Sequence, residues 1–210
     1  MQLDLEGIRA VVFDVDGTLF DKSRLPLHLV LADPLYMFVL NNERKARKTL
    51  SGVYFGDERT YYETLYGKVA ILSHLSAKRV KWWYDHRYMP AMIKVLRKHY
   101  ELRPWVSELL PALKEKGIKV AVYSDYGCIE ERLATLGFQK EWADVVADAP
   151  KMGGLKPCKE SFLALCEAIG EKPSDCVMVG DRDDTDGAGA RSVGMPFVLA
   201  KKKEIPQLDF

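Results

Sequence analysis

The stretch VVFDVDGTLF, residues 11–20, places two aspartates, Asp14 and Asp16, one residue apart directly after an apolar run. A short apolar run that is rich in β-branched residues predicts a buried β-strand. Two carboxylates at this spacing repel each other, and the fold alone gains nothing obvious from them. The stretch therefore indicates a cation bound at the end of the strand, or a proton held by one of the two acids.

Three other segments have the same apolar form and lie further along the chain: 118–125 (IKVAVYSD), 176–181 (CVMVGD) and 196–200 (PFVLA). Continuous apolar strands are typical of a parallel sheet that is covered on both faces. Between them, residues 105–116 and 159–169 repeat apolar side chains at helical spacing. Alternating strands and helices predict an α/β fold with a doubly wound, Rossmann-like parallel sheet.

Residues 21–103 contain no strand pattern, and their apolar and aromatic residues recur at helical spacing. Four helices are predicted here: one from Asp33-Pro34 to a stop at Gly52, one over residues 62–72, one from Ser76 through Trp83, and one that opens at Pro90. The aromatic residues of this segment, Trp82 among them, are expected in the core of the bundle, and the last ten residues of the chain are expected to form a surface extension. We therefore predict a core domain formed by residues 1–20 and 104–210, with residues 21–103 inserted as a helical cap domain. This middle segment carries 16 Lys and Arg against 8 Asp and Glu, whereas the remainder carries 15 against 22. Its run NNERKARKTL, residues 41–50, is interpreted first as a solvated helix face and second as a rim that attracts anions.

Composition excludes several classes of protein. The 210 residues are 48% apolar and 29% charged, which is typical of a globular protein. The sequence has no run of 18 apolar residues, so no membrane span is predicted. The acidic N-terminus lacks the apolar core of a signal peptide, so we expect a cytoplasmic protein. The four cysteines have no metal-binding spacing and are expected to be reduced thiols. Nothing beyond the basic run favours a nucleic-acid partner.

Polar residues stand at the ends of three predicted strands: Asp14 and Asp16, Ser124, and Asp181. The carboxyl ends of parallel strands open into one crevice, so these side chains are expected to meet there. Lys156, on the loop GGLKP, can reach the same place. Several carboxylates, a hydroxyl and an ammonium together favour phosphoryl transfer.

Each of these groups has a part in that chemistry. Asp14 can attack phosphorus to form an aspartyl-phosphate, and Asp16 can serve as general acid and then as general base. Mg²⁺ would bridge the anionic partners, with oxygens from Asp14 and Asp181 among its ligands. Ser124 would donate to a phosphate oxygen, and Lys156 would balance charge in the transition state.

The motifs DVDGT, the strand end at Ser124, Lys156 before Pro157, and VGDRDDTDGAGARSVGM together resemble the haloacid dehalogenase-like hydrolase superfamily. All four motifs occur in the family's order and cover nearly the whole predicted core. The resemblance implies the same roles for the residues above and adds Asp16 to the metal site. It also implies a second acid after Asp181, which Asp186 matches best, with Asp183 and Asp184 as competitors. Asp125 stands where the family more often has an amide, and we place it with the phosphate-binding residues.

The resemblance makes a Mg²⁺-dependent phosphatase acting on a small phosphorylated metabolite the leading prediction, for a monomer or a homodimer. The acid at Asp16 argues against a true dehalogenase. A phosphomutase of the same fold stays open, as does a phosphonate hydrolase that uses a lysine of the insertion, Lys68 or Lys81. A phosphate-binding or receiver-like module is the alternative from another class.

Overall fold

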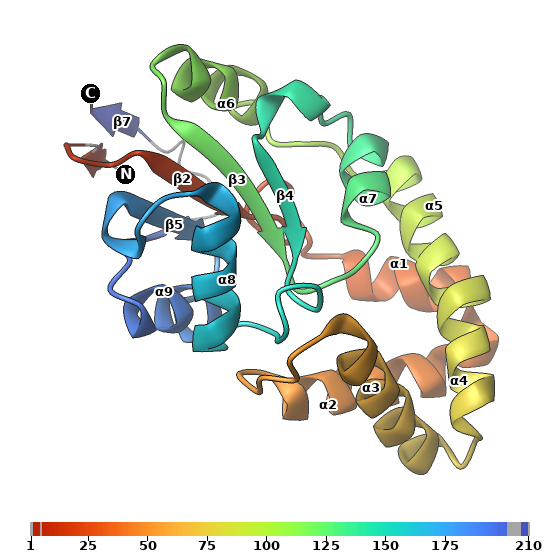
Figure 1. The fold of residues 1–210 in the computed structure, drawn as a ribbon. Coiled ribbons are helices and arrows are strands. Elements are labelled where there is room, and N and C mark those ends of the chain that lie inside the picture. Colours follow the sequence, from red (N-terminus) through yellow and green to blue (C-terminus); the bar gives the residue numbers. More distant parts are fainter. Residues whose placement is uncertain (1, 5, 201–206, 210) are drawn as a thin grey trace.

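A computed structural model describes residues 2–4, 6–200 and 207–209. Its centre is a five-stranded sheet in which every pair of neighbouring strands is parallel. The strand order is β4-β3-β2-β5-β6. The bounds are β2 Ala10–Asp14, β3 Lys119–Ser124, β4 Val145–Asp148, β5 Cys176–Gly180 and β6 Phe197–Leu199. The predicted α/β class with a parallel sheet is confirmed (Figure 1).

The central position of β2 explains why its residues are apolar throughout. All five of its residues are buried, as expected for a strand with neighbours on both edges and helices on both faces. In the register of the sheet, Asp14 lies beside Tyr123 and Phe13 lies beside Val179. The chain builds β3 and β4 on one side of β2 and then crosses to build β5 and β6 on the other. This reversal opens a crevice at the carboxyl end of β2.

The sequence did not predict β4, which is short and lies at the edge of the sheet. Its four residues, VVAD, are too few to show a clear strand pattern between the turns that flank them. The helices that accompany the sheet are α6 Val106–Glu115, α7 Ile129–Thr135, α8 Lys159–Ile169 and α9 Ala188–Ser192. Both helices predicted in this part of the chain, α6 and α8, are present, and each buries an apolar stripe against the core.

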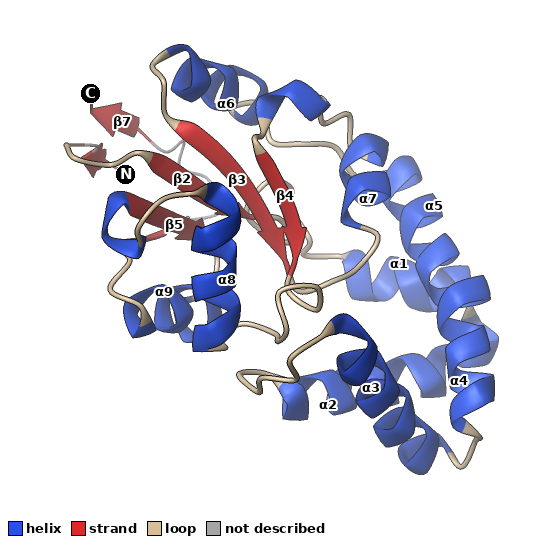
Figure 2. Ribbon diagram, in the orientation of Figure 1, coloured by secondary structure: helices blue, strands red, loops and turns tan. Residues whose placement is uncertain are grey.

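Residues 21–103, which we call the helical insertion, lie beyond the carboxyl edge of the sheet (Figure 2). The α-helices here are α1 Leu25–Ala32, α2 Met37–Leu50, α3 Glu58–Ser73, α4 Ala77–Trp83 and α5 Met89–His99. The first of them was not predicted. The helix predicted to open at Pro90 is α5, which has Pro90 in its first turn, and a single π turn, Tyr84–Tyr88, joins it directly to α4. The wider turn and the place of Pro90 in the first turn of α5 allow a proline in this otherwise continuous run.

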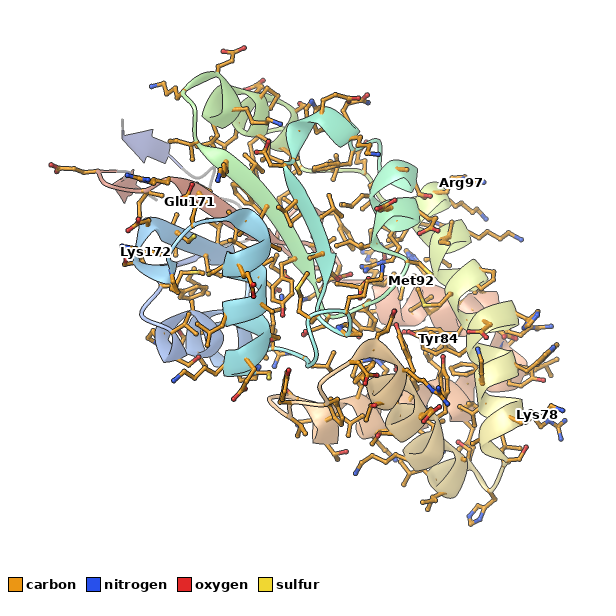
Figure 3. All side chains as sticks on the ribbon, viewed as in Figure 1. Lys78, Tyr84, Met92, Arg97, Glu171 and Lys172 are labelled. Atoms are coloured by element: carbon orange, nitrogen blue, oxygen red, sulfur yellow. The ribbon has the colours of Figure 1, made fainter. Side chains whose placement is uncertain are left out.

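Most of the aromatic residues predicted for the core of the insertion lie there, whereas Phe38 and Tyr54, two further aromatic residues of the insertion, are exposed. Tyr61, Trp83 and Tyr84 are buried, and the rings of Tyr84 and Tyr88 meet edge to face. Trp82 is 47% exposed and stacks on His86, so its expected place in the core was wrong. Figure 3 shows the exposed Lys78 and Arg97 on the outside of the helices that bury Tyr84 and Met92.

At the other end of the molecule, β1 (Gln2–Asp4) pairs in parallel with β7 (Gln207–Asp209). The last ten residues were expected to be a surface extension, and most of them lie outside the described residues. None of the helices in the described ranges has the length and the apolar character needed to cross a bilayer. All four cysteines have free thiols, as expected.

Candidate active site

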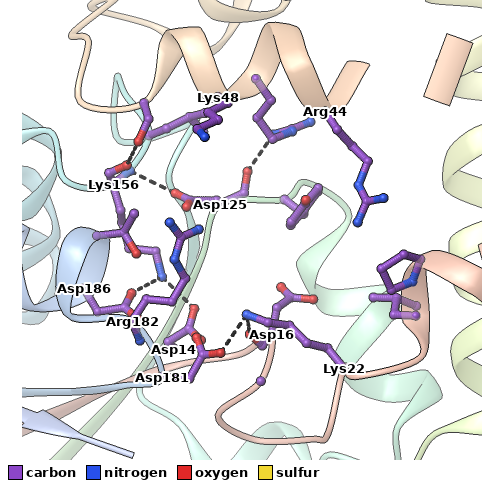
Figure 4. Close-up of a pocket in the computed structure, with 18 of the residues that line it drawn as sticks. Asp14, Asp16, Lys22, Arg44, Lys48, Asp125, Lys156, Asp181, Arg182 and Asp186 are labelled. Atoms are coloured by element: carbon purple, nitrogen blue, oxygen red, sulfur yellow. Dashed lines mark hydrogen bonds and ion pairs between the residues drawn. The ribbon is translucent and has the colours of Figure 1, made fainter. Parts of the chain in front are cut away.

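A cavity of about 710 Å³ lies between the carboxyl ends of the strands and the helical insertion (Figure 4). Its insertion side is formed by apolar residues such as Leu25 and Met92 and by basic residues of α2. Its core side carries six of the seven residues that the sequence predicted for the site: Asp14, Asp16, Asp125, Lys156, Asp181 and Asp186. Lys68 and Lys81, the candidates for a phosphonate hydrolase, are exposed and do not line the cavity.

Asp14 is the last residue of β2 and is only 5% exposed. Its Oδ1 accepts from the Lys156 ammonium at 2.6 Å, and its Oδ2 accepts from the Thr18 hydroxyl at 2.9 Å. Burial, opposed by Lys156 and reinforced by the negative charges of Asp186 and Asp16, raises the pKa of Asp14 to about 6. Holding an ionised carboxylate at this buried position therefore lowers the stability of the fold.

Lys156 connects several parts of the site. Its buried ammonium lies 2.6 Å from both Asp14 Oδ1 and Asp186 Oδ1. Burial alone would lower the pKa of Lys156, but these two carboxylates raise it well above its ordinary value, so it stays charged. Its backbone N–H donates to Asp125 Oδ1 at 2.9 Å, and its carbonyl accepts from the Ser51 hydroxyl at 2.7 Å. The contact with Asp125 shows what this unusual acid does here: it holds the loop that carries the lysine.

The structure separates the three acids that follow Asp181. Asp183 and Asp184 are exposed and pair with Arg191 and Arg182, at 2.8 and 2.6 Å. Asp186 is 1% exposed, because the π turn Asp183–Gly187 directs it inward. It contacts Lys156 and accepts from the backbone N–H of Arg182 at 3.1 Å. Of the three, it is Asp186 that faces Asp14.

Three carboxylates form a cluster that suits a hard metal ion. Asp14, Asp181 and Asp186 each offer an oxygen, and these oxygens lie within 4.8 Å of one another. Burial raises the pKa of Asp181 and of Asp186, against the pull of Lys22 and of Lys156, so a cation bound among these oxygens would favour their charged forms. The Lys22 ammonium lies 2.8 Å from Asp181 Oδ2 and also contacts the backbone carbonyl of Asp16. A cation therefore fits among these oxygens, and Asp16 offers its carbonyl rather than its side chain.

The side chain of Asp16 is held by Arg132. One nitrogen of the guanidinium lies 2.6 Å from each carboxylate oxygen, and the Ser124 hydroxyl donates to Oδ2 at 3.0 Å. Burial would raise the pKa of Asp16, but the charge and hydrogen bonds of Arg132 lower it below its ordinary value. Asp16 is therefore ionised here while Asp14, two residues away, is close to protonation.

Arg132 itself has no exposed surface and was not predicted from the sequence. It lies on α7, and its guanidinium also donates to the Ser124 hydroxyl at 3.0 Å. An arginine in the sequence IEERLAT resembles an ordinary solvated helix residue. The signal that could have identified it is its position on α7, eight residues after the strand end at Ser124. Ser124, predicted as a phosphate ligand, is fully buried and contacts Asp16 and Arg132.

A family profile for haloacid dehalogenase-like hydrolases matches residues 8–194. The chain belongs to the haloacid dehalogenase-like hydrolase family. The four motifs that suggested this family are the segments that carry Asp14, Lys156 and Asp181 to the cavity and place Ser124 against Asp16.

Several relatives of this family have named activities. A phosphoglycolate phosphatase of Aquifex aeolicus is 27% identical over 88% of this chain and 81% of its own length. A glyceraldehyde 3-phosphate phosphatase of Methanopyrus kandleri is 26% identical over 96% of this chain and 88% of its own length. Among solved structures, a predicted phosphoglycolate phosphatase from Haemophilus somnus superposes with a TM-score of 0.62 at 19% identity, over 97% of this chain and 94% of its own. An L-2-haloacid dehalogenase from Xanthobacter autotrophicus superposes with 0.61 at 21% identity, over 91% and 77%. These structures share the fold of the haloacid dehalogenase-like hydrolases.

Proposed function

We propose that this hydrolase is a Mg²⁺-dependent phosphatase that hydrolyses a small phosphomonoester through an aspartyl-phosphate on Asp14. The observation that carries the proposal is the position of Asp14 at the end of β2, buried between Lys156 and the oxygens of Asp181 and Asp186. The phosphatase names of the Aquifex and Methanopyrus relatives support the same reaction class.

The first step would break the ester bond to phosphorus as a bond to the Asp14 carboxylate forms. Lys156 keeps Asp14 ionised and compensates negative charge that gathers on the phosphoryl oxygens. Mg²⁺ at the oxygens of Asp14, Asp181 and Asp186 would neutralise the approaching phosphate. Thr18 fixes the direction of the nucleophile through its hydrogen bond to Oδ2.

The second step would hydrolyse the aspartyl-phosphate with water. Asp16, held as a carboxylate by Arg132, is ready to accept a proton from that water. The same proton, retained on Asp16, would be delivered to the leaving oxygen of the next substrate. The first of these two roles agrees directly with the ionised state of Asp16. The second requires its contacts with Arg132 to loosen when substrate binds.

The experiment measures hydrolysis of p-nitrophenyl phosphate with Mg²⁺ and with excess EDTA, for wild type and for Asp14→Asn. We expect turnover only for wild type with Mg²⁺. Equal turnover by wild type and Asp14→Asn would refute the proposal, and turnover that persists in EDTA would refute its metal dependence. Glu115→Gln, a change at the C-terminal end of α6 outside the cavity-lining set, is the matched control for loss of one acid.

A further inference from the structure

One face of helix α2 forms a wall of the cavity. Arg44, Arg47, Lys48 and Ser51, at the end of the helix, all line it. Arg47, Lys48 and Ser51 follow Arg44 by three, four and seven residues, and this spacing places the four side chains on one side of a helix. Lys45, one residue from Arg44, is exposed and does not line the cavity. The helix therefore presents three cations to the cavity and keeps a fourth away from it.

Among the residues that the structure describes, two of the three cations have no partner in an ion pair or a hydrogen bond. Arg47 is buried, lies 2.5 Å from Glu43 and donates to the Tyr61 hydroxyl at 2.7 Å. In the described part of the chain, neither Arg44 nor Lys48 makes an ion pair or a hydrogen bond, and both are exposed toward the cavity (Figure 4).

The acids around these two cations are already engaged. Asp184 attracts Lys48 at a distance, but its carboxylate lies 2.6 Å from Arg182. Carboxylates on the floor of the cavity are likewise held by cations: Asp14 and Asp186 by Lys156, and Asp181 by Lys22. Arg44 and Lys48 thus add positive charge to the cavity without forming an ion pair with any of these acids.

The stability of the helix does not account for this arrangement. Like charges four residues apart on a helix repel, and Arg44 and Lys48 have this spacing. Lys48 lies in the last turn of α2, where the helix dipole favours a cation, but Arg44 lies more than one turn earlier. An anion bound between the two side chains would relieve the repulsion.

We propose that Arg44 and Lys48 bind a second anionic group of the substrate, a carboxylate or a second phosphate, while its scissile phosphate lies at Asp14. This inference rests on the proposed phosphatase function and narrows its substrate class to small phosphate esters with two anionic ends. Apolar residues such as Leu25 and Met92 lie on the same side of the cavity. They would not stabilise an anionic group, so such a group is expected to lie against Arg44 and Lys48.

The substrate test compares two esters that differ in one anionic group. In 2-phosphoglycolate a carboxylate stands one carbon from the phosphate ester, and in 2-hydroxyethyl phosphate a neutral alcohol replaces it. Longer ω-carboxyalkyl phosphates extend the series and measure how far the second group must reach. We expect the kcat/KM of wild type for one member of the carboxylate series to exceed that for its neutral counterpart by at least roughly tenfold. A difference of this size corresponds to the free energy that one charge-assisted hydrogen bond contributes to binding.

The variants Arg44→Gln and Lys48→Gln should each lower this preference by about tenfold, mainly through KM for the carboxylated ester. Lys45→Gln removes the same charge from the same helix outside the cavity and should keep the preference of wild type. An equal preference in all four proteins, or no preference by wild type for any carboxylate, would overturn the proposal.

A binding experiment distinguishes the case in which the second-anion site is wrong from the case in which the phosphatase function is wrong. Calorimetric titration with phosphonoacetate and with ethylphosphonate, in Mg²⁺, compares a phosphonate that carries a carboxylate as its second anionic group with a near-isosteric phosphonate that lacks it, without turnover of an ester. If no ester is hydrolysed but phosphonoacetate binds more tightly and loses this advantage in Arg44→Gln, the second-anion site stands and the phosphatase proposal fails. If the two phosphonates bind alike, the site proposed here is wrong whatever the activity.

Discussion

The two aspartates of the first motif should change stability in opposite directions when each is replaced by asparagine. Asp14 is buried with its pKa raised to about 6, so its charge costs stability at neutral pH. Asp16 is buried with its pKa lowered, because Arg132 holds the charged form. In protein freed of metal by EDTA, Asp14→Asn should therefore stabilise the fold and Asp16→Asn should destabilise it.

The magnitudes follow from the same contacts. The pKa of Asp14 rises from 3.8 to about 6, and at 1.36 kcal/mol per unit its ionisation costs about 3 kcal/mol. Asparagine keeps some contact with Lys156 but gives up an ion pair, so we expect a gain of roughly 1 to 3 kcal/mol. Removing the charge of Asp16 leaves the guanidinium of Arg132 buried without its partner, which typically costs about 3 to 5 kcal/mol.

The raised pKa of Asp14 also fixes the direction in which stability changes with pH. Because its folded pKa is raised, folded wild type binds more protons than the unfolded chain between pH 3.8 and about 6. The stability of wild type relative to Asp14→Asn should thus fall as the pH rises through this window and stay constant above it. Below the window both side chains are neutral, and the gain from the substitution should vanish.

Urea denaturation of wild type and both variants, in EDTA and across this pH range, measures these differences. A loss of stability in Asp14→Asn comparable to that in Asp16→Asn at neutral pH would refute the reasoning. It would mean that the attraction of Lys156 outweighs the burial of Asp14. Excess Mg²⁺ should stabilise wild type more than Asp14→Asn, since one carboxylate of the cluster is then missing.

Two glycines and a lysine give further tests. Replacing Lys22, which contacts Asp181, by methionine should lower the Mg²⁺ concentration for half-maximal activity several-fold, because a competing cation is removed; a higher requirement would contradict this. In Gly180→Ala the added Cβ would lie 2.4 Å from Asp186 Oδ2, so activity should fall by at least roughly tenfold as that carboxylate shifts. Gly67→Ala, in α3 and with open space around its Cβ, is the control and should raise stability by up to about 1 kcal/mol in thermal melts. A fully active Gly180→Ala would show that Asp186 is dispensable.

The sheet and the position of the site could be predicted because local sequence determines both. A buried parallel strand must be apolar along its length, and the polar residue that ends it must lie at the carboxyl edge. This reasoning identified Asp14, Ser124 and Asp181 from their strands, and the structure places all three at that edge. The edge strand β4 was missed because four residues give no periodicity.

The contacts of Asp16 could not be predicted because they depend on pairing between distant segments. Arg132 lies 116 residues from Asp16, and nothing in its own helix distinguishes it from a surface residue. Asp125 illustrates the same limit: its carboxylate binds the backbone of Lys156, a contact that only the folded loop creates. The helix that opens at Pro90 was predicted, but the π turn that joins it to α4 was not, since that turn has no clear sequence signal.

The most direct test of the central claim is the covalent state of Asp14 during turnover. Rapid acid quenching of the enzyme with Mg²⁺ and substrate, followed by peptide mass spectrometry, should find one added phosphoryl group on the peptide that contains Asp14. The account predicts that the label appears within the first turnover, accumulates in Asp16→Asn and is absent from Asp14→Asn. Turnover without any phosphorylated peptide, or a label on another residue, would contradict it.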